Sequence, residues 1–247
     1  MAAFDECIGQ VSDYVKEMRR AGRPVSEFEA QRELPVEVGP NAAAGIILRG
    51  DTFVELGSPQ VGSCAALLWT RDVSRVADGR ITLFGPDVPA SRGESLPFAQ
   101  VLLVAGRDLD ESDHEKLQQA QHVSGEIEGY MVRSTAENIW GRVSHDAAAK
   151  GFDCRVLGSA LIALVKRAAP AVSGVEVLFV TTDREDVKRL AGICSRAKQV
   201  AGDILKETWK ARGYDVDCGF DCGSCMDESV CDDIREVIVA SRKRAKG

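Results

Sequence analysis

The stretch from Ala65 to Val104 decides the fold class, because three short apolar runs recur in it: AALLW (65–69), ITLF (81–84) and VLLV (101–104). Each run has the length and composition of a buried strand, and turns such as Gly85-Pro86-Asp87 separate them. Two more β-prone runs come earlier, at 46–48 and 53–56. This region therefore predicts a sheet of short strands.

After Gly106 the spacing of apolar residues changes from the period of a strand to that of a helix. Four segments have helical spacing, at 110–122, 126–134, 136–149 and 157–168. Residues 175–180 are the one late, continuous apolar strand, and a last amphipathic helix is expected from a cap at Thr182, with Glu185 reaching back, to about Lys210. Strands first and helices later predict an α+β fold with a mixed sheet, followed by a cysteine-ligated metal loop and a C-terminal helix.

The N-terminus predicts an amphipathic helix over about 4–21, since apolar residues recur there at three- and four-residue steps and Gly22 and Pro24 end the pattern. Composition shifts then divide the chain into three parts. These are an N-terminal amphipathic helix and linker (1–36), an α+β domain (37–213), and a cysteine cluster with a C-terminal helix (214–247).

Charge and composition exclude several classes of protein. The chain has 247 residues, of which 45% are apolar, and its 38 acidic against 31 basic residues give a net charge of −7. Such a balance argues against nucleic acid or an anionic membrane surface as the partner. We find neither an uncharged N-terminal signal segment nor an apolar run of about 18 residues, so a cytoplasmic protein is expected.

Four of the eight cysteines are clustered near the C-terminus, with the spacing Cys218-x3-Cys222-x2-Cys225-x5-Cys231. Four soft ligands on a glycine-containing loop are what a [4Fe-4S] cube or a tetrahedral zinc ion needs. The two halves of the motif run together, which favours iron-sulfur but leaves zinc open. Seven acidic residues and no basic residue lie between Asp215 and Asp233, and such charge would lower the potential of an iron-sulfur centre.

Several phrases of the sequence resemble one known family, the β (acetyl-CoA synthase) subunit of the carbon monoxide dehydrogenase/acetyl-CoA synthase complex. The phrases are FVELG (53–57), DGRITLFGPD (78–87), IEGY (127–130), NIWGRVS (138–144) and VLFVTTD (177–183). The resemblance implies an α+β middle domain that leads into a metal domain, where a nickel-iron-sulfur A-cluster joins methyl, CO and coenzyme A.

The cysteine region departs from that family's pattern. In the family the gaps between the later cubane ligands are longer, so Cys222, Cys225 and Cys231 match in type only, and Cys218 would replace the fourth ligand from the N-terminal side. No Cys-Gly-Cys sequence, which holds the second nickel in the family, occurs in residues 1–247. The resemblance therefore supports a [4Fe-4S] cluster, and we expect a shortened relative without the complete A-cluster.

Other side chains are weaker candidates for a site. The resemblance to an enzyme that uses coenzyme A makes Trp140 and Arg142, with Arg133, candidate coenzyme A contacts on neighbouring predicted helices, although core packing for Trp140 and surface charge for the arginines are the simpler interpretation. The three histidines and Cys194 have simple interpretations. His114, His122 and His145 are expected to be solvated or at the edge of the core, and Cys194 is expected to be buried.

Three functions remain open at this point. The first is an iron-sulfur protein that serves as an electron-transfer or accessory subunit in anaerobic one-carbon or acyl-CoA metabolism, with a redox or corrinoid/acyl-transfer enzyme as its heteromeric partner. The second is a synthase-like enzyme whose open metal site is completed by a partner chain. The third is a binding module in which zinc stabilises the cysteine loop. No catalytic residue is assigned from the sequence.

Overall fold

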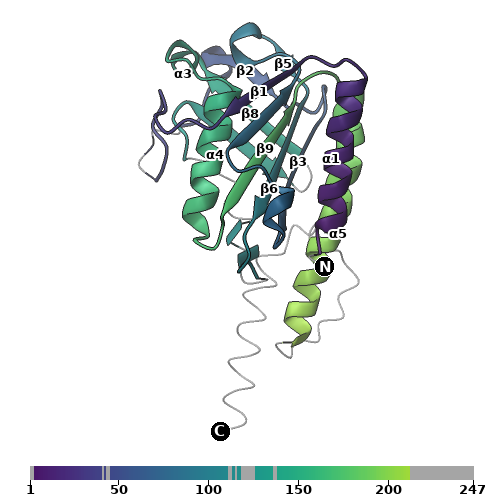
Figure 1. Cartoon of the computed structure of the whole chain (residues 1–247). Coiled ribbons are helices and arrows are strands. Elements are labelled where there is room, and N and C mark those ends of the chain that lie inside the picture. The colour runs from purple at the N-terminus through teal and green to yellow at the C-terminus, as the bar shows by residue number, and fades with distance from the viewer. Residues whose placement is uncertain are drawn as a thin grey trace. The chain divides into compact units, whose positions relative to one another are not determined.

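The computed structural model describes residues 3–40, 42, 45–110, 113, 114, 116, 117, 126–135 and 138–211. Within them, the chain forms helices and strands, most of which are labelled in Figure 1. The predicted metal loop and C-terminal helix, at 214–247, lie outside the described residues. Two compact units divide the chain, Met1–Ala197 and Lys198–Gly247, and the division falls within the last described helix.

The larger sheet has five strands in the order β1-β4-β9-β6-β3. Their bounds are Val25–Glu29 (β1), Arg80–Phe84 (β4), Gly174–Val180 (β9), Phe98–Ala105 (β6) and Ser63–Thr70 (β3). The sheet is mixed, because β4 is parallel to β9 and β3 to β6, whereas β9 and β6 are antiparallel. Every residue of β6 and β9 is buried, which explains why both strands are apolar except for Gln100 and Glu176.

The smaller sheet has four strands in the order β5-β2-β8-β7, with bounds Ser95–Leu96 (β5), Thr52–Leu56 (β2), Asn138–Ser144 (β8) and Tyr130–Thr135 (β7). Burial alternates along β8: Ile139, Gly141 and Val143 are buried, whereas Trp140 and Arg142 are only partly covered. The sheet therefore has one face on the core and one partly open face, as expected for antiparallel strands.

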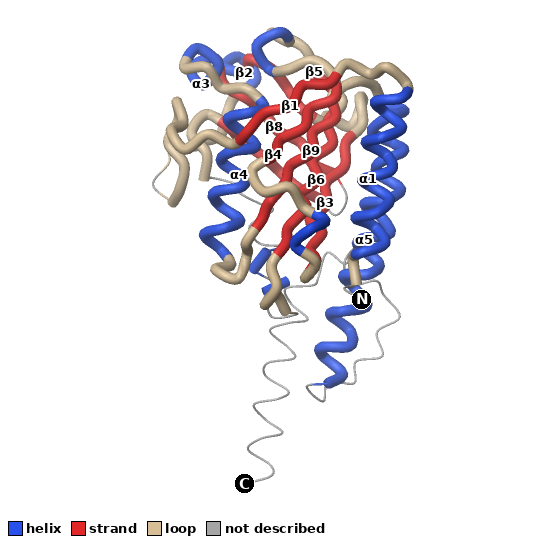
Figure 2. Tube along the Cα trace, in the orientation of Figure 1, coloured by secondary structure: helices blue, strands red, loops and turns tan. Residues whose placement is uncertain are grey.

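Helices cover both faces of the larger sheet (Figure 2). On one face lies α4 (Cys154–Ala168), whose Gly158 lets it approach closely, since a Cβ there would lie 2.8 Å from the side chain of Ile81. The other face carries α1 (Asp5–Arg20) and the start of α5 (Arg184–Ala211). The thiol of Cys64 on β3 lies 3.7 Å from the carbonyl oxygen of Val187 on α5.

Most of the predicted elements are confirmed. The α+β class is correct, as are the strands predicted at 53–56, 65–69, 81–84, 101–104 and 175–180. The N-terminal helix is also confirmed, and its apolar side is buried at Cys7, Ile8, Val11, Tyr14 and Met18. No helix among the described residues is long and apolar enough to span a membrane.

Three predictions of secondary structure are wrong. The run at 46–48 forms no strand but a loop, in which Ile46 is 77% and Leu48 63% exposed whereas Ile47 is buried. The helices predicted at 126–134 and 136–149 are replaced by β7 and β8, and only the short helix α3 (His145–Ala149) remains. Most of the helix predicted at 110–122 lies outside the described residues.

Candidate functional site

The partly open face of the smaller sheet brings the predicted residues Trp140 and Arg142 together. They are two residues apart on β8, so both side chains lie on the same side of the sheet. Across the strand pair, Arg133 on β7 is opposite Trp140, and Met131 is opposite Arg142. The expectation that these residues lie on helices was wrong, but they are indeed neighbours.

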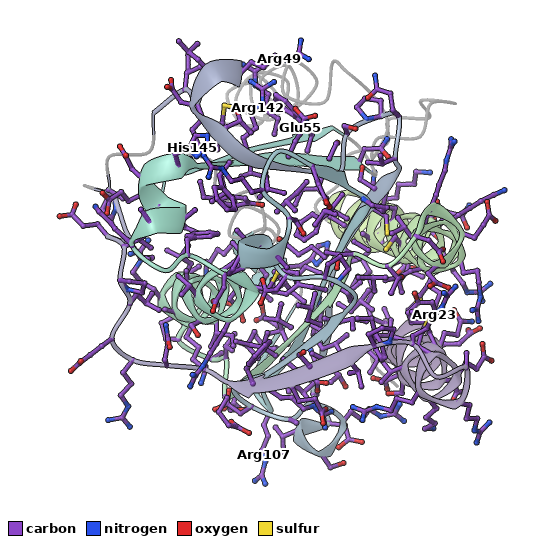
Figure 3. All side chains as sticks on the ribbon, turned by 90° about the horizontal axis from the view of Figure 1, so that it is seen from above. Arg23, Arg49, Glu55, Arg107, Arg142 and His145 are labelled. Atoms are coloured by element: carbon purple, nitrogen blue, oxygen red, sulfur yellow. The ribbon has the colours of Figure 1, made fainter. Side chains whose placement is uncertain are left out.

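Arg142 is held by three contacts. Its Nε donates to Oε1 of Glu55 on β2 at 3.1 Å, its Nη1 donates to the carbonyl oxygen of Ile47 at 3.1 Å, and its guanidinium carbon lies 4.6 Å from the centre of the Trp140 ring. The Arg142 and Glu55 side chains are 19% and 26% exposed, so water screens this ion pair only partly. Figure 3 shows Arg142 and Glu55 near each other, on the side of the molecule that also carries Arg49 and His145.

These contacts define what the face offers chemically. The Nε and Nη1 donors of Arg142 are engaged with Glu55 and Ile47, whereas Arg133, the register partner of Trp140, is exposed. An indole ring with one guanidinium stacked on it and a second arginine opposite it on the next strand is suited to a planar ring that bears phosphate. Glu55 was not predicted as a partner of Arg142, although it lies in the FVELG phrase, on a strand that pairs with β8.

The described histidines differ in environment. His114 is 7% exposed and accepts a hydrogen bond at Nδ1 from Nε1 of Trp69 at 3.1 Å. His145 is exposed and lies edge-on to Phe53, with ring centres 5.6 Å apart. The prediction of a histidine at the edge of the core or in solvent therefore holds for His145, but His114 is a buried, hydrogen-bonded residue. His122 lies outside the described residues.

Four cysteines lie in the described part of the chain, and all four are buried free thiols: Cys7, Cys64, Cys154 and Cys194. Burial of Cys194 is as predicted. Burial also raises the pKa of the Cys7 and Cys154 thiols, which keeps them protonated and poor metal ligands. The described residues contain no group of three or more His, Cys, Asp or Glu side chains that would hold a metal ion. Cys218, Cys222, Cys225 and Cys231 lie outside the described residues.

Comparison with known proteins identifies the family. The family model of the CO dehydrogenase/acetyl-CoA synthase complex beta subunit matches residues 34–187. The chain therefore belongs to this family, as the sequence phrases indicated.

Three relatives illustrate the similarity. The chain is 33% identical over 159 residues to the acetyl-CoA decarbonylase/synthase complex subunit beta of Methanopyrus kandleri. The aligned residues make up 63% of this chain and 34% of the relative. The chain is 29% identical over 164 residues to the corresponding subunit of Archaeoglobus fulgidus, covering 65% and 31%. It is 30% identical over 200 residues to the carbon monoxide dehydrogenase/acetyl-CoA synthase subunit alpha of Moorella thermoacetica, covering 79% and 27%. The chain thus spans about a third of the length of the curated relatives it matches.

Proposed function

We propose that this chain is a [4Fe-4S] protein that serves as an electron-transfer or accessory subunit in anaerobic one-carbon or acyl-CoA metabolism. The observation that carries the proposal is the separation of the eight cysteines into two kinds. Four are dispersed, buried thiols of the packed core, whereas Cys218, Cys222, Cys225 and Cys231 fall within fourteen residues. Four thiolates are the donor set of a [4Fe-4S] cluster.

The chemistry follows from this donor set. Such a cluster, when bound, supplies one-electron transfer, and with four cysteine ligands it leaves no iron open to substrate. The acidic residues around the cysteines favour the oxidised form and so a low potential. Among the residues that the structure describes, no side-chain group would hold the cluster, so the proposal places all its ligands at the four C-terminal cysteines.

Replacing the ligands tests this assignment. Each of Cys218→Ser, Cys222→Ser, Cys225→Ser and Cys231→Ser should lower the iron content of protein purified without oxygen, because each removes one thiolate ligand. Cys64→Ser and Cys154→Ser are matched controls that should keep full iron. Iron and sulfide analysis with electron paramagnetic resonance provides the measurement.

The same measurement separates the alternatives. Full iron in Cys218→Ser would show that this residue is not a ligand and would support a synthase-like enzyme with an open metal site. Stoichiometric zinc without iron, and no absorption near about 400 nm of the kind a cluster gives, would support the zinc-stabilised binding module instead.

A heteromeric partner is part of the proposal. The relatives from Methanopyrus kandleri and Archaeoglobus fulgidus are named as subunits of an acetyl-CoA decarbonylase/synthase complex. A redox enzyme or a corrinoid/acyl-transfer enzyme is the class of partner that would exchange electrons or acyl groups with such a subunit.

Coenzyme A contact at Trp140 and Arg142 is a second, separate proposal, which the stacking of Arg142 on Trp140 favours. Because Arg142 is engaged with Glu55, the exposed Arg133 is the group that would meet a phosphate. Acetyl-CoA should quench the fluorescence of Trp140, and Arg133→Ala should weaken binding by about tenfold, the loss of roughly one charge-assisted contact. Equal binding by Arg133→Ala and by the control Arg19→Ala would contradict this contact.

A further inference from the structure

A buried histidine joins three segments of the unit Met1–Ala197. Trp69 on β3 donates its indole N–H to Nδ1 of His114 at 3.1 Å. Phe4, beside the first turn of α1, stacks on the His114 ring with centres 5.6 Å apart and meets the Trp69 ring edge-on at 6.1 Å. Phe4 and Trp69 are 1% and 2% exposed, so the three rings form a closed cluster.

The hydrogen bond fixes the protonation state of His114. An indole nitrogen only donates, so Nδ1 must be the unprotonated nitrogen and the ring proton must be on Nε2. A second proton can enter only at Nδ1. Two N–H groups would then face each other across 3.1 Å, and this bond would be lost.

The charged groups that the structure describes nearby have partners of their own. Thr70 donates to the Asp5 carboxylate of α1 at 2.7 Å, and Nε of Arg71 donates to the carbonyl oxygen of Leu109 at 2.6 Å. On the histidine's own segment, Asp113 pairs with Lys116, and its backbone N–H donates to Asp110. The described residues give His114 no ion pair, so its added charge would be buried without a partner among them.

We infer that His114 is a proton-operated latch, which holds Phe4 and the described residues 113, 114, 116 and 117 against β3 while Nδ1 is unprotonated and releases them when the ring becomes an imidazolium. Burial lowers the pKa of His114, so the folded protein takes this proton less readily than the unfolded chain. The contribution to stability is therefore complete above about pH 6.5, the ordinary pKa of histidine, and is lost as the pH falls below it.

Fluorescence of Trp69 tests the latch directly. In a variant with Trp140→Phe and Trp209→Phe, Trp69 is the only tryptophan left of three. Its emission should change between pH 7.5 and 5 with a midpoint below about 6.5, since the indole loses its acceptor. His114→Asn places an amide oxygen near the position of Nδ1 but cannot be protonated, so it should abolish the transition. His145→Asn, at the exposed histidine, should leave the transition unchanged.

Two results would overturn the inference: emission that does not change over this range, or a transition that persists in His114→Asn. If His114→Asn fails to fold, nitrogen NMR of the histidine-labelled wild-type protein decides. The inference requires an Nε2–H tautomer for His114 at pH 7.5, and a proton on Nδ1 at that pH would refute it.

Discussion

At the scale of single residues, Tyr130 stands out because its hydroxyl group is buried and, among the described residues, has no hydrogen-bond partner. Its ring stacks on Phe152 with centres 5.8 Å apart and lies against Gly141, where a Cβ would lie 3.0 Å from the hydroxyl oxygen. A glycine at that point on β8 thus makes room for the ring on β7. Tyr130 is held by its aromatic surface, and its hydroxyl is a cost to the fold.

Tyr130→Phe should therefore raise the free energy of unfolding by about 1 kcal/mol, because it removes a buried hydroxyl that lacks a partner. Tyr14→Phe is the matched control: the Tyr14 hydroxyl donates to the carbonyl oxygen of Asp186 at 3.1 Å, and its loss should lower the same free energy by about 1 kcal/mol. Urea unfolding followed by circular dichroism measures both. A Tyr130→Phe protein less stable than wild type would mean that an ordered water bonds to the hydroxyl.

At the scale of elements, the ion pair between Glu55 and Arg142 connects β2 and β8 and holds the loop that precedes β2. The two residues are register partners on antiparallel strands, and Arg142 also donates to Ile47 in that loop. Lysine cannot reproduce this arrangement, because it lacks the planar fork that meets a carboxylate, a carbonyl oxygen and an aromatic ring together.

Arg142→Lys should thus lower the free energy of unfolding by about 1 kcal/mol, and a double-mutant cycle with Glu55→Gln should give a coupling energy near 1 kcal/mol. The exposed pair of Lys16 and Asp13, 61% and 71% exposed, is the control and should couple by less than about 0.5 kcal/mol. Additive effects at Glu55 and Arg142, within about 0.3 kcal/mol, would show that the pair does not stabilise the sheet.

The elements also show which sequence signals were sufficient. Continuous apolar runs identified β6 and β9 because both are buried on two faces, and helical spacing identified α1 because its buried residues follow that period. In β8, by contrast, the alternation of buried and partly covered residues is hidden in the sequence, because the buried Gly141 has no side chain and the partly covered Trp140 is apolar. The alanines of 147–149 then extend an apparent helical pattern backwards over the strand.

The candidate site was predictable only in part for the same reason. Trp140 and Arg142 were predicted to be neighbours, but on a helix. The position of Glu55 opposite Arg142 follows only from the pairing of β2 with β8, which are distant in the sequence. Phe4, which stacks on the buried His114, is also far from it along the chain.

At the scale of the whole molecule, the packed structure begins earlier in the sequence than the family match does. The match covers residues 34–187, yet α1 and β1 lie before it and are part of the same structure. α1 buries its apolar side, and β1 extends the larger sheet by pairing with β4. The N-terminal helix is therefore part of the packed body, and its apolar side is not available to a partner.

The strand order of the larger sheet has a consequence for how the protein is made. β9 lies at the centre of the sheet, between β4 and β6, but it is the last of the described strands to leave the ribosome. Until β9 has been synthesised, the edges of β4 and β6 that pair with it are unpaired. Pairings between segments that are distant in the sequence also form slowly. Unpaired edges also attract other chains. The yield of soluble protein should therefore depend on the rate of translation between β6 and β9. Fast synthesis of this interval should raise the yield, because nascent chains then spend less time with unpaired strand edges that can aggregate.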